Sequence, residues 1–127
     1  MAFPPPWEHR LAERNLAAMW ANYRDLGYRR MIYVNTVSVR VVSALIEAMG
    51  DDPCVTAVLL RCGDATARQR IGQREIGSAL QRHIDRGLVF ARELEERAPR
   101  WVHRVDTDGR AVAAIAAEVI GLTGWTA

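Results

Sequence analysis

The stretch that decides the expected fold is VTAVLLRCGDATARQRIGQREIGSALQRHIDRG, residues 55–87. It begins with an apolar run rich in β-branched residues, Val55 to Leu60, which is typical of a strand buried on both faces. Asp64 stands where a helix N-cap is expected, and the helical spacing that follows runs through Arg74. The stretch therefore predicts a strand that leads directly into a helix.

A second, longer helix is predicted in the same stretch. Gly77 and Ser78 interrupt the helical spacing, and Ser78 is a suitable cap for a helix that ends before Pro99. Its apolar stripe is Leu80, Ile84, Leu88, Ala91 and Leu94.

The C-terminal part continues the alternation of strand and helix. Trp101 to Val105 is predicted to be a strand, and the turn DTDGR, residues 106–110, leads into a last helix. The residues expected to face inward on that helix are Val112, Ile115, Ala116 and Val119.

The N-terminal part is predicted to hold two helices around one strand. After the extended prolines Pro4 to Pro6, a helix runs from Trp7 to Leu26, and Gly27 is placed to end it. A buried strand follows over Met31 to Val34. The helical stripes are Leu16, Met19, Trp20 and Tyr23, and then Val42, Leu45, Ile46 and Met49, the second of which stops at Gly50.

Strands that alternate with helices predict a parallel sheet, because parallel strands need crossover connections that are usually helical. We expect one partial domain over residues 1–127. Its parts are a substrate-side helix, strand and helix at 7–54, an arginine helix with a lid-like region at 55–100, and a last strand and helix at 101–127.

Composition limits the class of protein. No apolar run is long enough to cross a bilayer, and residues 1–10 lack the order of a signal peptide, so a cytoplasmic protein without membrane contact is expected. Cys54 and Cys62 have no spacing typical of a metal site or disulfide framework, and we expect reduced core residues. All 17 basic residues are arginines, and residues 61–104 hold ten of them against six acidic residues.

Residues 55–87 and VHRVDTDGRAVAAIAAEVIGLTGW, residues 102–125, carry a family resemblance. Over about residues 8–125 the chain resembles the second half of P-loop small-molecule kinases, the nucleotide, adenylylsulfate, gluconate and shikimate kinase group. It also resembles uncharacterised actinobacterial ATP-binding proteins of that type. The resemblance implies an α/β fold, namely an incomplete three-layer domain with about three parallel strands flanked by helices.

The resemblance also implies where a nucleotide or its phosphates would bind. The arginine fork suits phosphate because it binds bidentately and stays charged. The candidates are Arg68, Arg70 and Arg74 on the helix before a lid at 75–86, and Asp106, Thr107, Gly109 and Arg110 after the last strand. For the arginines a solvated helix surface is the alternative, and for Asp106 and Thr107 it is helix capping.

Two further candidates follow the expected first strand. Asn35 and Thr36 lie where open α/β sheets bind ligands, outside the carboxyl end of a strand, and they are the substrate-side candidates. A local turn is the alternative role for both residues. No catalytic residue can be named, and no metal site is indicated.

The phosphate-binding loop of such kinases is absent from the sequence. The nine glycines never form Gly-x-x-x-x-Gly-Lys, and the chain contains no lysine. That loop grips the triphosphate and its hydroxyl holds magnesium, so ATP and Mg²⁺ are implied by the resemblance alone. We expect a truncated relative of a transferase acting on a nucleoside, nucleotide or other small molecule, inactive by itself.

Two other functions stay open. Loss of the first kinase strand would leave an open sheet edge, so the chain could be an interaction module completed by a partner or by its own copy. Alternatively, the two helices around Gly77 could form a DNA-binding helix-turn-helix. Acidic residues that alternate with Arg92 and Arg97 weaken a phosphate-tracking stripe, so nucleic acid is the less favoured partner.

Overall fold

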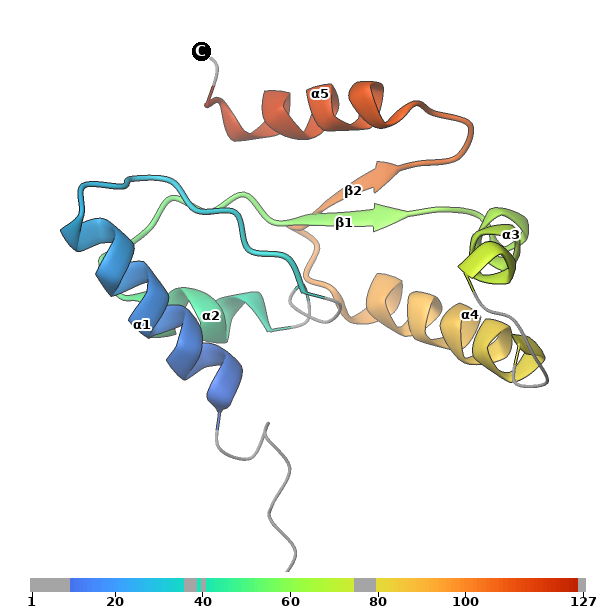
Figure 1. Cartoon of the computed structure of the whole chain (residues 1–127), viewed down its shortest axis with the longest axis horizontal. Coiled ribbons are helices and arrows are strands. Elements are labelled where there is room, and N and C mark those ends of the chain that lie inside the picture. The colour runs from blue at the N-terminus through green and yellow to red at the C-terminus, as the bar shows by residue number, and fades with distance from the viewer. Residues whose placement is uncertain (1–9, 36–38, 40, 75–79, 126–127) are drawn as a thin grey trace, which may run out of the picture. The chain divides into compact units, whose positions relative to one another are not determined.

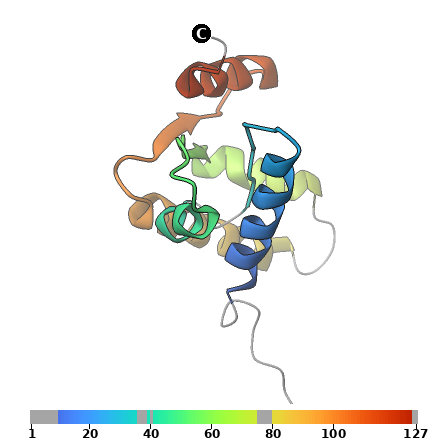
Figure 2. The ribbon, with the colours of Figure 1, turned by 90° about the vertical axis from the view of Figure 1, so that its left-hand side faces the viewer.

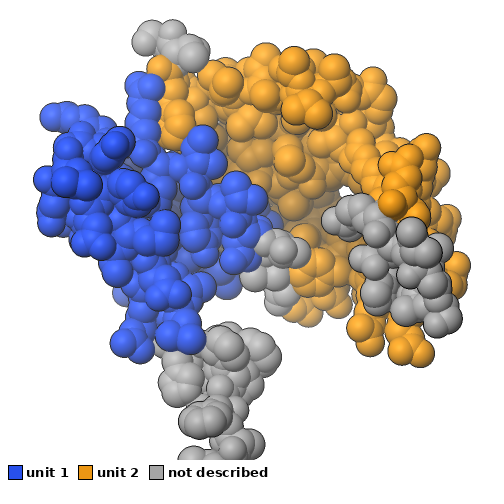
Figure 3. Space-filling view, viewed as in Figure 1, with its two compact units in different colours: residues 1–55 blue, residues 56–127 orange. Residues whose placement is uncertain are grey.

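The computed structural model describes residues 10–35, 39, 41–74 and 80–125. Contacts divide the chain into two compact units, Met1–Val55 and Thr56–Ala127 (Figure 3). The expected proline lead-in, Thr36, the Gly77–Ser78 break and part of the lid-like region lie outside the described residues. In chain order the elements are α1 (Leu11–Asp25), α2 (Val42–Met49), β1 (Val58–Arg61), α3 (Asp64–Arg74), α4 (Leu80–Arg97), β2 (His103–Asp106) and α5 (Val112–Thr123) (Figure 1).

The first unit is built on α1 and α2, which pack against each other. α2 has the predicted bounds, and all four residues of its predicted stripe are buried or half-buried. Met19 and Tyr23, predicted to belong to the α1 stripe, remain about half exposed. The buried side chains of the helix pair are Leu16, Trp20, Val42 and Leu45.

The C-terminus of α1 is closed by a glycine turn. Gly27 has a φ of 94°, a conformation that L-residues rarely adopt. Its N–H donates to the carbonyl of Arg24 at 2.9 Å, and the N–H of Tyr28 donates to the carbonyl of Tyr23 at 3.1 Å. These two bonds form a Schellman motif, which confirms the prediction that Gly27 ends this helix.

The second unit holds a parallel pair of strands. β1 and β2 pair in the register Leu59 to Arg104 and Leu60 to Val105. Within this unit α4 lies on one side of the strands and α5 on the other, while α3 packs against α4 (Figures 1 and 2). The buried apolar residues are Ala57, Leu59, Ile84, Leu88, Leu94, Ala98, Val102 and Val105.

The predicted three-layer α/β kinase-like fold is wrong. The described residues are mostly helical and contain two short strands, both in the second unit. Met31 to Val34, predicted to be a buried strand, belongs to no sheet, and Ile32 and Val34 are 77% and 87% exposed. An apolar run is compatible with a strand, but a strand also needs a neighbour for its backbone N–H and C=O groups. That neighbour cannot be deduced from local pattern.

The predicted inward face of α5 is also wrong. No residue of α5 is buried. Val112 is 83% exposed and Ala116 is exposed, while Ile115 and Val119 are half-buried. Among the described elements, α5 makes substantial contact with β2 alone. The physical reason is that the two-stranded sheet is too narrow to cover one face of this helix.

Both cysteines are free thiols, with Cys54 exposed and Cys62 half-buried. The expectation that both are core residues therefore fails for Cys54. None of the helices in the described ranges has the length and apolarity needed to cross a membrane.

Candidate functional site

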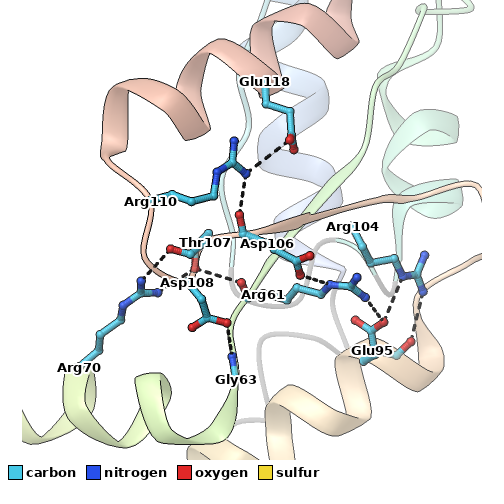
Figure 4. Close-up of polar contacts among 10 residues, drawn as sticks. All are labelled: Arg61, Gly63, Arg70, Glu95, Arg104, Asp106, Thr107, Asp108, Arg110 and Glu118. Carbon is cyan, nitrogen blue, oxygen red and sulfur yellow. Dashed lines mark hydrogen bonds and ion pairs between the residues drawn. The ribbon is translucent and has the colours of Figure 1, made fainter.

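The loops that follow β1 and β2 leave the same edge of the sheet, because the two strands are parallel. Most of the sequence-predicted site residues lie in or beside these loops (Figure 4). The strand pairing extends one residue beyond β2, since the N–H of Thr107 donates to the carbonyl of Arg61 at 2.9 Å. The two loops are therefore held together from their first residues.

Thr107 links the two loops to α3. Its side chain is buried, with 7% of the residue exposed, and its hydroxyl donates to the carbonyl of Arg61 at 2.9 Å. The guanidinium of Arg70 donates to the Thr107 hydroxyl at 2.8 Å and to the Thr107 carbonyl at 3.2 Å. Two sequence-predicted residues are thus brought together, and the Thr107 hydroxyl is engaged by the chain itself as both donor and acceptor.

Asp108 satisfies a backbone donor at the start of α3. Its carboxylate accepts a hydrogen bond of 2.8 Å from the N–H of Gly63. A hydrogen bond from the Thr66 side chain, followed by the one from Gly63, lowers the pKa of Asp108 below its ordinary value of 3.8. A carboxylate beside a helix N-terminus is also favoured by the helix dipole. A group of the chain itself therefore occupies the position where an external anion would bind.

Arg61 at the end of β1 joins two carboxylates. It donates to Asp106 at 2.6 Å and to Glu95 on α4 at 2.8 Å. The hydrogen bond to Asp106 is the main cause of the raised pKa of Arg61. Both carboxylates are substantially exposed, so solvent screens these ion pairs and each contributes little to stability.

The remaining candidates have diverse surroundings. Arg110 donates to the carbonyl of Asp106 at 2.8 Å and lies 3.4 Å from the Glu118 carboxylate, and Gly109 makes the intervening turn with a φ of 60°. Arg68 is exposed on α3. Arg74 is the last residue of that helix, and its side chain is outside the description.

The substrate-side candidates belong to the first unit. Asn35 is exposed there, and Thr36 falls outside the described residues. In the part of the chain that is described, no group of three or more His, Cys, Asp or Glu residues could hold a metal ion. The expected ATP and Mg²⁺ are not tested by this geometry.

Several residues near the loops after β1 and β2 were not predicted from the sequence. Arg61 and Glu95 are 34 positions apart, and Gly63 and Asp108 are 45 apart. No local spacing signals such pairs, because they depend on which strands pair and in which register. Arg61 could have been suspected from its position directly after an apolar strand pattern.

Comparison with known proteins finds similarity to proteins other than the expected kinases. The chain is similar to UPF0502 proteins. Relatives from Pseudomonas savastanoi pv. phaseolicola and Pseudomonas fluorescens are 34% identical over 101 residues and 32% identical over 100 residues. These matches cover 73% and 72% of this chain, but 44% and 43% of the relatives. A UPF0502 protein of Pseudomonas putida is 31% identical over 80 residues, which cover 57% of this chain and 37% of that protein.

The chain thus spans less than half the length of the curated relatives it matches. No family model and no solved structure matches the chain. The expected resemblance to P-loop kinases is therefore wrong: the relatives carry the name of a family of unknown function, which supports neither ATP binding nor kinase activity. The helix-turn-helix alternative stays an untested prediction.

Proposed function

We propose that this chain is an interaction module that associates with a second copy of itself through α5. The observation that carries the proposal is that α5 is an almost wholly apolar helix with no buried residue. Soluble proteins rarely expose such a surface unless it is an interaction site. The loops after β1 and β2, where most of the predicted ligand residues lie, are a weaker candidate for a binding site. Most of the described charged groups there bind one another.

The exposed apolar surface continues from α5 onto the sheet. Leu60 on β1 lies opposite Val105 on β2 in the strand register, so both side chains point to the same face. Val105 is fully buried, whereas Leu60 is 56% exposed. α5 packs against β2, and Leu60 on β1 is left exposed on this face. A second helix lying next to α5 would cover it.

Charge decides which helix fits. The sole ionisable residue of α5 is Glu118, and Arg110 lies 3.4 Å from its carboxylate. Charged groups of a partner would lose their hydration at this surface and find few opposite charges there, which costs free energy. Among the described helices α3 and α4 carry many charges, and α2 already packs against α1. The α5 helix of a second copy offers the matching uncharged face.

The size of the surface sets the expected strength. A 12-residue helix is about 18 Å long, so one helix face is smaller than the roughly 800 Å² that each partner contributes to a standard interface. We therefore expect a weak dimer that forms at high protein concentration. The cytoplasmic location expected from the sequence remains part of this proposal.

Sedimentation velocity over a range of about 1–500 µM tests the proposal. The expected result is a shift from monomer to dimer for the wild type and a monomer throughout for Ile120→Glu, which puts a charge on the exposed part of α5. Val89→Glu is the matched control because Val89 is a similarly exposed residue on α4. A wild-type monomer at every concentration, or equal association by all three proteins, would overturn the proposal.

A further inference from the structure

Residues 31–34 have the composition of a strand but belong to no sheet among the described residues. Ile32, Tyr33 and Val34 are of the types that strands favour. Met31 and Tyr33 are half-buried. Ile32 and Val34, which alternate with them, are 77% and 87% exposed. An exposure period of two is expected of a strand with one covered face, and the α5 surface makes no use of this run.

β1 has one paired edge and one open edge. The carbonyls of Ala57 and Arg61 each accept a hydrogen bond of 2.9 Å from an N–H group of residues 103–107. Because the backbone groups of a strand alternate in direction, Val58 and Leu60 point their N–H and C=O groups to the opposite edge. The described sheet ends at that edge, since it has two strands. These groups can therefore pair with a further strand.

The outer edge of β2 is less suited to a further strand. By the same alternation, Asp106 points its backbone groups to that edge, and its carbonyl accepts a hydrogen bond of 2.8 Å from the Arg110 side chain. An added strand would have to displace this side chain. The edge of β1 is therefore the one that a further strand fits.

Residues 31–34 match the open edge of β1 in length and in side-chain pattern. β1 is four residues long, as is the run. Antiparallel pairing can place Ile32 opposite Leu60, and Val34 then lies opposite Val58. Residues directly opposite each other point to the same face, so all four side chains stand on one face of the sheet. Leu60 is 56% exposed in the single chain, so the pairing covers apolar surface on both strands.

We propose that residues 31–34 of one copy add to the open edge of β1 in a second copy as an antiparallel third strand. Both halves of the contact belong to this chain, so a symmetric dimer forms it twice. The inference rests on the proposed dimer through α5, because four residues make too few hydrogen bonds to hold two chains together. The third strand in turn widens the sheet, whose two strands are too narrow to cover α5.

A charge exchange between two copies tests the pairing. Ile32→Lys puts a charge against apolar Leu60 and should weaken the dimer about tenfold in sedimentation velocity. Leu60→Glu puts a carboxylate at the facing position, and opposite charges on facing strands attract. Dye-labelled Ile32→Lys, followed by its fluorescence, should therefore bind unlabelled Leu60→Glu several-fold more tightly than unlabelled Val89→Glu. Val89 is the matched control because it is similarly exposed on α4.

Ile120→Glu keeps this test separate from that of the α5 surface. If Ile120→Glu is monomeric but Ile32→Lys associates like the wild type, the dimer uses α5 and the strand pairing is wrong. Equal binding of labelled Ile32→Lys to the two partner variants would also overturn the inference. A wild type that stays monomeric would overturn it together with the α5 dimer. Ile32 and Leu60 are exposed in the single chain, so circular dichroism should show a wild-type fold for each variant.

Discussion

The guanidinium of Arg104 donates a hydrogen bond of 2.9 Å to the carbonyl of Ala98, the first residue after α4. It also donates to the carbonyls of Glu95 at 3.2 Å, Pro99 at 2.8 Å and Val102 at 2.8 Å. The last carbonyls of a helix have no partner within the helix. A single side chain on β2 therefore closes the C-terminus of α4 and ties that helix to the sheet.

Replacing Arg104 should destabilise the second unit. Arg104→Ala removes the charged donor from the carbonyls of Glu95 and Ala98 at the end of α4 and from two carbonyls of the following turn. We expect a loss of about 2–3 kcal/mol in the free energy of unfolding. Arg104→Lys should recover part of it, because an ammonium group cannot reproduce the planar fork. Urea denaturation measures both changes.

A matched control for Arg104 is Arg100→Ala, at an exposed arginine in the neighbouring turn. Its effect should stay within about 0.5 kcal/mol, as is usual for surface changes. If Arg104→Ala is as mild as Arg100→Ala, the described closure of α4 is not a significant source of stability.

The contact between Arg70 and Thr107 should appear as an energetic coupling. Thr107→Val removes a buried hydroxyl that both donates and accepts, and we expect a cost of about 1–2 kcal/mol. Combined with Arg70→Ala, the two changes should be less than additive by about 0.5–1 kcal/mol. Arg68→Ala, on the same helix, serves as the control and should be additive with Thr107→Val. If the effects of Arg70→Ala and Thr107→Val are strictly additive, the contact between the two residues contributes no coupling energy.

Asp108 should make stability depend on pH in the acid range. Its folded-state pKa lies below the ordinary value of 3.8, so its contribution is fully present above that value and disappears as the pH falls through the folded-state pKa. Wild type should be more stable than Asp108→Asn at pH 6, and the difference should shrink below about pH 4. Thermal unfolding of both proteins across this range gives the comparison. A difference that is constant with pH would contradict the role of the carboxylate charge.

Much of the helical structure could be predicted from sequence because its signals are local. The stripe from Val42 to Met49 and the positive φ at Gly27 both follow from residues within one or two helical turns. The predicted helix through Arg74 is present, and Asp64, predicted as its N-cap, is the first residue of α3. Its carboxylate, however, accepts a hydrogen bond from Arg92 on α4. The donor at Gly63 is instead satisfied by Asp108, 45 residues away.

The failures share a non-local cause. The run Met31 to Val34 has the composition of a strand, but composition does not supply the neighbouring strand that it needs. The apolar stripe of α5 predicted a buried face, but the described sheet beneath it is two strands wide. Of the predicted site arginines on α3, Arg70 reaches Thr107 after β2. Their partners, which decide whether they are free to bind a ligand, depend on strand register and were not predictable.

The exposed face of α5 should affect association without affecting the fold. Ala117→Glu and Ile120→Glu both place a charge on surface that is exposed in the single chain. Each should abolish dimer formation while changing the free energy of unfolding of the dilute monomer by less than about 0.5 kcal/mol. Unfolding at a concentration well below the dimer dissociation constant separates the two effects. A large loss of stability would mean that α5 packs within its own chain.

Isotope-filtered NOE spectroscopy on a mixture of labelled and unlabelled copies at high concentration tests self-association through α5. Because the signals arise only between copies, they locate the interface without mutation. We expect intermolecular NOEs from the methyl groups of Ile120 to α5 and to Leu60 of the other copy. Intermolecular NOEs that leave out α5, or their complete absence where sedimentation shows a dimer, would contradict it.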